Sequence, residues 1–177
     1  MGEKEDRQLK MFLIALEIEE KGRAFYETVA NSSSHPLGKK IFKMLTADEL
    51  VHKKRIKTLY QSLTKNHIWS EDWKELKVEQ SAPEKIFKSL SKKQAKNLEF
   101  DASDLAALEV GIGLEFASIS FYQERLNDAK EKGETEFLAQ MIKEEKTHHS
   151  LLADMKLYLR DPSAWFIEKE RHGLDGA

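Results

Sequence analysis

One internal repeat constrains the fold of this chain more than any other feature of its sequence. The pattern Glu-x6-Tyr occurs twice, the pattern Glu-x-x-His occurs twice, and each second copy lies 96 residues after the first. The matched pairs are Glu19 and Glu115, Tyr26 and Tyr122, Glu49 and Glu145, and His52 and His148. Residues 1–65 and 97–161 are therefore interpreted as two copies of one unit, and such a repeat is considered before any single motif.

Each copy of the repeat has the pattern of two helices. Apolar residues recur at alternating steps of three and four, which predicts amphipathic helices that each bury one face. The chain has only three prolines and eight glycines, consistent with long uninterrupted helices. The four expected helices cover about residues 7–31, 36–63, 101–130 and 134–160.

The segment 64–100 between the two copies is different. It contains Trp69 and Trp73 and one expected short helix near 83–90, so it is interpreted as a long crossover connection. Short connections within each hairpin and one long crossover predict an all-α, ferritin-like four-helix bundle. A short C-terminal helix, Ser163–Glu170, is expected to dock Trp165 and Phe166 on the bundle. The expected single domain, 1–177, consists of hairpin 7–63, crossover 64–100, hairpin 101–160 and tail 161–177.

Each predicted helix carries a glutamate about midway along its apolar seam, and two helices add a histidine one turn later. Burying one unpaired carboxylate costs several kcal/mol or forces it to protonate, and four together raise one another's pKa. Two divalent cations would neutralise four carboxylates. One glutamate from each of two helices and Glu-x-x-His from the other two is the ligand arrangement of ferritin-like di-iron and di-manganese bundles. The predicted ligands are Glu19, Glu49, His52, Glu115, Glu145 and His148.

The residue types also indicate which metal the site would hold. Hard carboxylate oxygens with one imidazole per metal suit Fe(II) and Mn(II), whereas zinc favours a tighter four-coordinate site. We therefore expect two Fe ions per chain, with Mn or Zn as possible substitutes. Tyr26 and Tyr122 are either core tyrosines with satisfied hydroxyls or residues that hydrogen-bond and orient carboxylates around the site.

Four further polar residues lie near the predicted ligands in sequence but off the seams. They are expected to be solvated, and they are Glu109, Glu144, His149 and the turn residue His35.

The composition excludes several classes of function. The chain has no cysteine, which excludes disulfides, thiolate catalysis, iron–sulfur clusters and cysteine-bound zinc. The 29 basic and 31 acidic residues form no clustered basic face, so no nucleic-acid partner is expected. No signal peptide is visible, and no apolar run is expected to approach the roughly 18–20 residues of a membrane span. We expect a cytoplasmic protein with no membrane partner.

Three segments resemble rubrerythrin-like proteins, and the resemblance extends over about residues 8–160. They are Ala15–Tyr26 (ALEIEEKGRAFY), Leu45–His52 (LTADELVH) and Met141–His148 (MIKEEKTH). The resemblance implies a homodimeric di-iron oxidoreductase, typically a peroxide reductase active in oxidative stress. It also implies terminal ligands at Glu19 and Glu115, bridging ligands at Glu49 and Glu145, and one histidine per iron, His52 and His148.

Two features depart from the rubrerythrin pattern. Full-length rubrerythrins add a rubredoxin-like domain with four cysteines, so a cysteine-free chain is expected to use an external electron donor such as rubredoxin. Rubrerythrins also carry an extra carboxylate one turn from the third-helix glutamate. Here those neighbours are Gly111, Ile112, Ser118 and Ile119, and the six-ligand set resembles that of bacterioferritin.

Three functions follow from these patterns. The first is the reduction of hydrogen peroxide or dioxygen, the second is ferroxidase or iron-handling activity, and the third is a non-catalytic bundle whose metals only staple its core.

Overall fold

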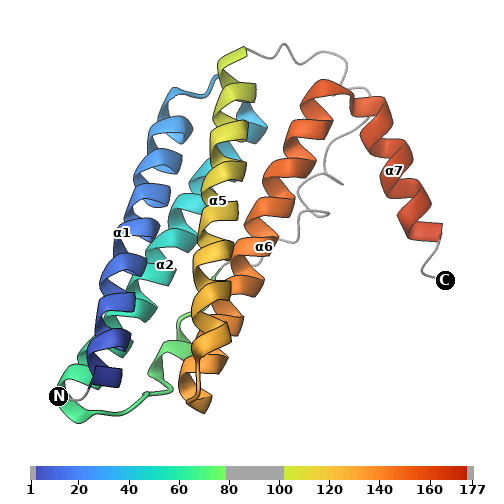
Figure 1. Cartoon of the computed structure of the whole chain (residues 1–177). Helices are drawn as coiled ribbons and strands as arrows, with labels where there is room; N and C mark the ends of the chain where they lie inside the picture. Colours follow the sequence, from blue (N-terminus) through green and yellow to red (C-terminus); the bar gives the residue numbers. More distant parts are fainter. Residues whose placement is uncertain (1–2, 79–101, 175–177) are drawn as a thin grey trace.

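The computed structural model describes residues 3–78 and 102–174, and these residues form helices and short connections (Figure 1). No strand occurs among them, so the all-α prediction is confirmed. The elements are α1 (Glu3–Ser32), α2 (Pro36–Asn66), the short 3-10 helix η1 (Asp72–Glu75), α5 (Ala102–Asp128), α6 (Lys132–Arg160) and α7 (Pro162–Leu174).

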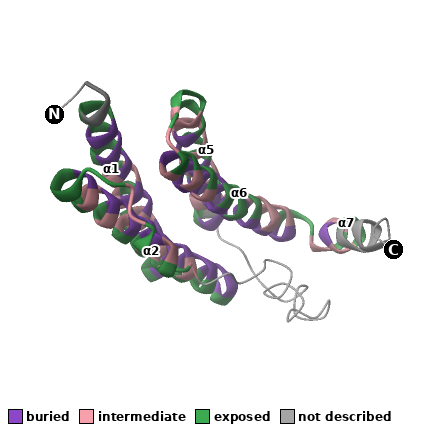
Figure 2. Ribbon diagram, turned by 90° about the horizontal axis from the view of Figure 1, so that it is seen from below, coloured by how far each residue is buried: buried purple, intermediate pink, exposed green. Residues whose placement is uncertain are grey.

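The four long helices form two antiparallel hairpins that pack against each other. Helix α1 lies along α2, and α5 lies along α6 (Figure 1). Seen from below, the α1–α2 hairpin lies beside the α5–α6 hairpin, and buried residues recur along each of the four long helices (Figure 2). The predicted ferritin-like bundle of two repeated hairpins is therefore confirmed.

The start and the end of α2 have identifiable local causes. His35 precedes the helix in an extended conformation, and its Nδ1 accepts a hydrogen bond from Gly38 N at 3.2 Å. Because this cap is buried, with 3% of His35 exposed, the prediction that His35 is solvated is wrong. At the other end, His67 adopts a left-handed conformation with φ 56° and donates its N–H to Leu63 O at 3.1 Å. This C-cap stops the helix three residues beyond the predicted end.

The apolar core consists of two clusters, one toward each end of the bundle. The upper cluster in Figure 1 includes Tyr26, Phe42 and Leu152, and the lower one includes Phe12 and Phe137. Burying each such side chain contributes about 1.5–3 kcal/mol. The polar residues midway along the helices therefore lie between two apolar layers.

The C-terminal helix docks through an aromatic side chain, as predicted, although it extends further than Ser163–Glu170. Trp165 is buried, and its ring meets that of Tyr158 edge-on at a centroid distance of 5.8 Å. Phe166 is partly buried and packs beside both rings. In the connection after α2, Trp73 is buried, whereas the predicted helix near 83–90 lies outside the described residues.

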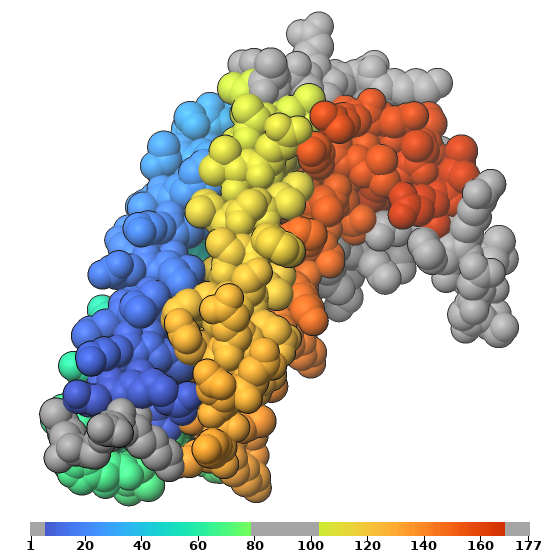
Figure 3. All heavy atoms as spheres, in the orientation of Figure 1, coloured from blue at the N-terminus to red at the C-terminus, as the bar shows by residue number. Residues whose placement is uncertain are grey.

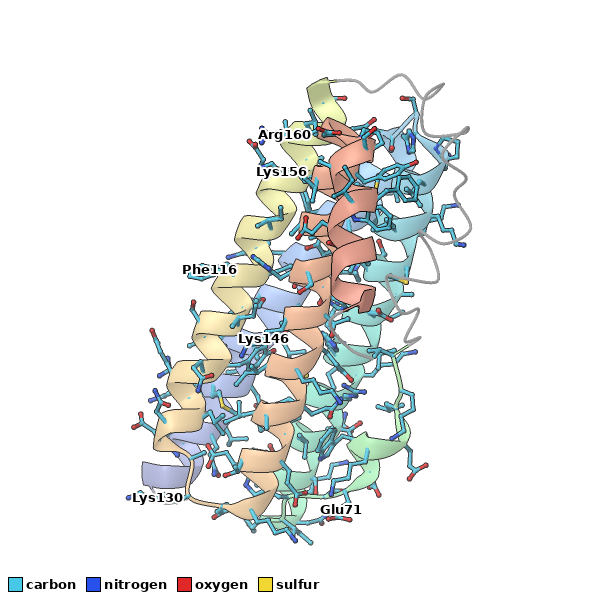
Figure 4. The ribbon with its side chains drawn as sticks, turned by 90° about the vertical axis from the view of Figure 1, so that its right-hand side faces the viewer. Glu71, Phe116, Lys130, Lys146, Lys156 and Arg160 are labelled. Carbon is cyan, nitrogen blue, oxygen red and sulfur yellow. The ribbon has the colours of Figure 1, made fainter. Side chains whose placement is uncertain are left out.

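Helix α5 is more apolar on its outer face than the sequence led us to expect. The segment Ser103–Asp128 is long and apolar enough to cross a membrane by length and composition alone, which makes the expected lack of such a run wrong. Core helices of bundles pass the same test, so this is weak support for a membrane span. However, only 28% of the apolar window is buried. Phe116 points away from the bundle (Figure 4), on the face where α5 lies between α1 and α6 (Figure 3).

Candidate metal centre

The six predicted ligand residues meet midway along the bundle, between the two apolar clusters. Each of the four long helices contributes at least one of them, and each side chain comes from the seam that faces the opposite hairpin. No residue of the six is more than 3% exposed. The residues are Glu19 on α1, Glu49 and His52 on α2, Glu115 on α5, and Glu145 and His148 on α6.

These side chains form two overlapping groups of four. In each group one ligand atom per residue lies within 4.8 Å of all the others. Glu49 and Glu145 belong to both groups, so each of these carboxylates can bridge two ions. The first group is Glu19, Glu49, His52 and Glu145, and the second is Glu49, Glu115, Glu145 and His148. The geometry is that expected for a binuclear site.

Both imidazoles turn Nδ1 toward the carboxylates of the centre. His52 Nδ1 lies 3.2 Å from Glu19 Oε2 and 3.0 Å from Glu145 Oε1. His148 Nδ1 lies 3.5 Å from Glu49 Oε1 and 3.7 Å from Glu115 Oε2. The two rings are stacked with centroids 5.5 Å apart.

The other nitrogen of each imidazole faces a carboxylate on the opposite hairpin. His52 Nε2 lies 2.9 Å from Glu144 Oε2, and His148 Nε2 lies 3.3 Å from Asp48 Oδ2. A proton on Nε2 satisfies these contacts and leaves the Nδ1 lone pair for a metal. Carboxylates in this position fix the ring and make the imidazole a stronger ligand.

The prediction that Glu144 is solvated is therefore wrong. Its side chain is buried because Arg55, 2% exposed, forms an ion pair with it through two guanidinium nitrogens. Burial raises the pKa of Glu144, but hydrogen bonds from His52 and Arg55 outweigh this and lower it to about 2. The repeat carries a signal for this residue, since Asp48 lies 96 residues earlier and both acids directly precede a predicted bridging glutamate.

The other two off-seam residues lie away from the centre. Glu109 is exposed, as predicted, and its Oε1 is 2.9 Å from Lys156 Nζ. His149 is half-buried rather than fully solvated.

Each tyrosine reaches across to the other hairpin. The Tyr26 hydroxyl, from α1, donates a hydrogen bond to Glu115 Oε1, and the Tyr122 hydroxyl, from α5, donates one to Glu19 Oε1. Burial, followed by the charge of the bonded glutamate, raises the pKa of both tyrosines, so both stay protonated donors. Of the two roles that the sequence left open, this favours orienting carboxylates. The acceptors are predicted ligands themselves rather than further carboxylates around them.

The ion-free centre cannot hold all its carboxylates in the charged form. Burial, then the charge of Glu49, raises the pKa of Glu19 to about 8. The pKa of Glu145 is also raised, first by burial and then by the charges of its neighbours. Burial likewise raises the pKa of Glu49, but its close polar contacts with Glu19 and both histidines outweigh burial and lower the pKa. Carboxylates this close share protons unless cations replace them.

Unsatisfied ligand atoms give a second indication that cations belong here. Within the described part of the chain, four buried atoms of the centre make no hydrogen bond: Glu115 Oε2, Glu145 Oε1, Glu145 Oε2 and His148 Nδ1. Native proteins leave few buried polar atoms unsatisfied, and a bound ion is one explanation when they do. Two hard divalent cations would satisfy these atoms and balance the four carboxylates.

The comparisons with known proteins agree with this geometry. The family model for rubrerythrin matches residues 10–156. That span includes all six residues of the centre, both tyrosines, Asp48 and Glu144. A search of curated proteins and a search of solved structures each returned no match.

Proposed function

The chain belongs to the rubrerythrin family, and on that premise we propose that it is an oxidoreductase that reduces hydrogen peroxide, or dioxygen, at a di-iron site. One observation carries the proposal, namely the two ligand groups that share Glu49 and Glu145. Such sharing is needed for two ions that act as a pair. We propose Glu19 and Glu115 as terminal ligands, with His52 and His148 as one ligand per iron.

The bound metals would supply the electrons. When bound, two Fe(II) ions would supply one electron each, which together with two protons would suffice to reduce one hydrogen peroxide to two waters. The protein's own groups keep the site dry, because no ligand is more than 3% exposed. The hydroxyls of Tyr26 and Tyr122 hold Glu115 and Glu19 in place by hydrogen bonds. Mn or Zn could occupy the same ligands.

Turnover then requires that electrons return to the site. The chain has no cysteine, so it cannot bind an iron–sulfur centre of its own through thiolates. We propose a separate electron-carrier protein, rubredoxin being the candidate that the family resemblance suggests. We further propose that the protein acts in the cytoplasm as a homodimer.

Anaerobic iron loading followed by separate additions of peroxide and oxygen tests the proposal. Elemental analysis should give two irons per chain. The diferrous protein should react with peroxide at least about tenfold faster than with oxygen, which corresponds to about 1.4 kcal/mol in barrier height. With reductant and rubredoxin it should turn over repeatedly and keep its iron.

Two other outcomes would identify the alternatives. If oxygen is the faster oxidant, and added Fe(II) is consumed far beyond two per chain, the protein handles iron as a ferroxidase. If zinc replaces iron without loss and neither oxidant reacts, the metals only stabilise the bundle.

A further inference from the structure

A cavity of about 840 Å³ opens on the side of the bundle beside η1 and α6. Figure 4 shows η1 and the residues after it, which follow the labelled Glu71, running beside α2. Trp73 and Lys74 from this segment line the cavity, and α6 contributes Gln140 and Lys143. Arg55 and Glu144 are the least exposed of its lining residues. The lining therefore includes the carboxylate that bonds His52.

The lining of the cavity is cationic. Four basic side chains, Arg55, Lys74, Lys77 and Lys143, line it together with two acidic ones, Glu136 and Glu144. Both acids are already neutralised, because Lys74 Nζ lies 2.7 Å from Glu136 Oε2 and Arg55 pairs with Glu144. Lys77 and Lys143 are exposed, and neither is ion-paired within the described residues. This surface repels a cation such as Fe(II) and attracts an anionic partner.

Polar contacts connect the cavity to the metal centre. Arg55 Nη2 lies 3.2 Å from Glu144 Oε1, and Glu144 Oε2 lies 2.9 Å from His52 Nε2. Arg55 also donates to Leu76 O at 2.8 Å and lies 5.9 Å from the Trp73 ring centroid. One carboxylate thus separates a surface cavity from a predicted iron ligand.

Within residues 3–78 and 102–174, the position equivalent to Arg55 in the second copy of the repeat holds no arginine. The residue 96 positions after Arg55 is Leu151, which is buried in the upper apolar cluster. The cavity and its arginine are therefore an addition to the symmetric site. They distinguish the His52 side of the centre from the His148 side.

We propose that this cavity is the docking site of a small acidic protein that delivers single electrons to the centre through Glu144 and His52. The inference rests on the proposed function, which needs an external reductant. A cavity of about 840 Å³ would admit a protruding acidic loop of the carrier, with Lys77 and Lys143 contacting its carboxylates. Each reduced carrier would give up one electron, enough to convert one Fe(III) to Fe(II), so two dockings would be needed to restore the diferrous site. No covalent bond would form or break.

Binding of oxidised rubredoxin to the iron-loaded, oxidised protein tests the site without electron transfer. In Lys77→Glu/Lys143→Glu, the dissociation constant measured by calorimetry should rise at least about tenfold, and the wild-type affinity should fall as salt is raised. The matched control is Lys39→Glu/Lys40→Glu, which alters net charge equally at exposed positions on α2. It should stay within about twofold of wild type.

Three results would overturn the inference: no binding by the wild type at low salt, an equal loss in the control, or no loss in the cavity variant. Circular dichroism and iron content show whether each variant is folded. If the charge reversal disturbs the fold, Lys77→Ala/Lys143→Ala replaces it, with a smaller expected loss in the same direction. Oxidation of the pre-reduced wild-type protein by peroxide needs no carrier. That measurement tests the proposed function separately from the docking site.

Discussion

Each histidine of the centre turns its Nδ1 toward the predicted metal ligands and its Nε2 toward a carboxylate of the opposite hairpin. This arrangement makes Glu144 and Asp48 part of the site even though neither belongs to a ligand group. Both are 4% exposed, and both accept a hydrogen bond from a histidine Nε2. Their negative charge increases the basicity of the coordinating nitrogen.

Removal of this charge should weaken metal binding. We expect Glu144→Gln to lower metal affinity by about 10- to 100-fold, because the amide keeps the size of the side chain but not its charge. Anaerobic Fe(II) titration measures the change. Glu109→Gln is the control, since Glu109 is exposed on α5 and pairs with Lys156 and Arg160 of α6. Wild-type affinity in Glu144→Gln would show that this carboxylate is structural only.

The tyrosines act on carboxylates at the opposite ends of the centre. Tyr26→Phe and Tyr122→Phe remove one hydrogen bond each, to Glu115 and Glu19 respectively. We expect both variants to retain two irons per chain but to be oxidised at altered rates, because a freed terminal carboxylate changes its position. Stopped-flow absorbance after peroxide addition reports the rate. Unchanged kinetics in both variants would leave these residues a role in core packing alone.

Sequence periodicity located these inward-facing residues but not what lies beside them. The six glutamates and histidines lie on apolar seams, so a helix pattern is sufficient to bring them together. Glu144 lies next to a seam, and its burial depends on Arg55, which comes from another helix and 89 residues away. An ion pair between two different helices leaves no periodic pattern in the sequence. The repeat alone could have indicated it, because residues 48 and 144 are both acidic.

At the scale of helices, each hairpin contributes three of the six residues of the metal centre. Glu49 from α2 and Glu145 from α6 belong to both ligand groups. Glu49→Ala and Glu145→Ala should therefore reduce metal content to a similar degree, far beyond the effect of a surface change of about 0.5 kcal/mol. Elemental analysis after anaerobic loading measures it, with Glu109→Ala as the silent control. Wild-type affinity for both metals in either variant would contradict the two-fold site.

The helices themselves were predictable, whereas their ends were not. Long apolar seams identified the four helices of the bundle and their pairing. Helix α1 begins at Glu3, before its apolar seam, and the C-cap of α2 depends on the single left-handed residue His67, which has no apolar period. Likewise, α7 continues to Leu174, four residues beyond the predicted end at Glu170.

At the scale of the whole molecule, the buried acids link stability to pH. In the ion-free fold the pKa of Glu19 rises from 4.5 to about 8. The folded state then binds more protons than the unfolded state between these values, so this stability is lost as pH rises. The raised pKa of His52 has the same effect, because it also makes the folded state less stable as pH rises. Glu144, with a pKa lowered to about 2, acts oppositely but only below 4.5.

We therefore expect the metal-free protein to have a lower Tm at about pH 8 than at about pH 5. Bound divalent ions should remove most of this difference and release protons as they bind, because they replace the protons shared among the carboxylates. Calorimetric unfolding with and without metal checks both statements. Equal Tm values at the two pH values in the metal-free protein would show that the carboxylates do not share protons in this way.

The exposed outer face of α5 bears on how copies of the chain associate. Phe116 is 64% exposed and Val110 is 51% exposed, and the small residues Gly113 and Ala117 lie exposed beside them. A Cβ added at Gly113 would meet no atom within 4 Å among its described surroundings. Large exposed apolar faces mark interaction sites, and small residues let a second helix approach closely. We propose that this face contacts a second copy of the chain, which would form the proposed homodimer.

Phe116→Glu tests this interface with little risk to the metal centre, because Phe116 points outward while its neighbour Glu115 is buried (Figure 4). Truncating or charging an aromatic anchor typically costs about 2 kcal/mol or more, which corresponds to a dimer dissociation constant roughly 30-fold higher. Light scattering after gel filtration should show a dimer for the wild type and monomer for the variant at low concentration, with iron content unchanged. Ile68→Glu is the control, because Ile68 is 59% exposed in the connection after α2. A monomeric wild type, or wild-type binding to lipid vesicles through α5, would assign this face to something other than a second copy.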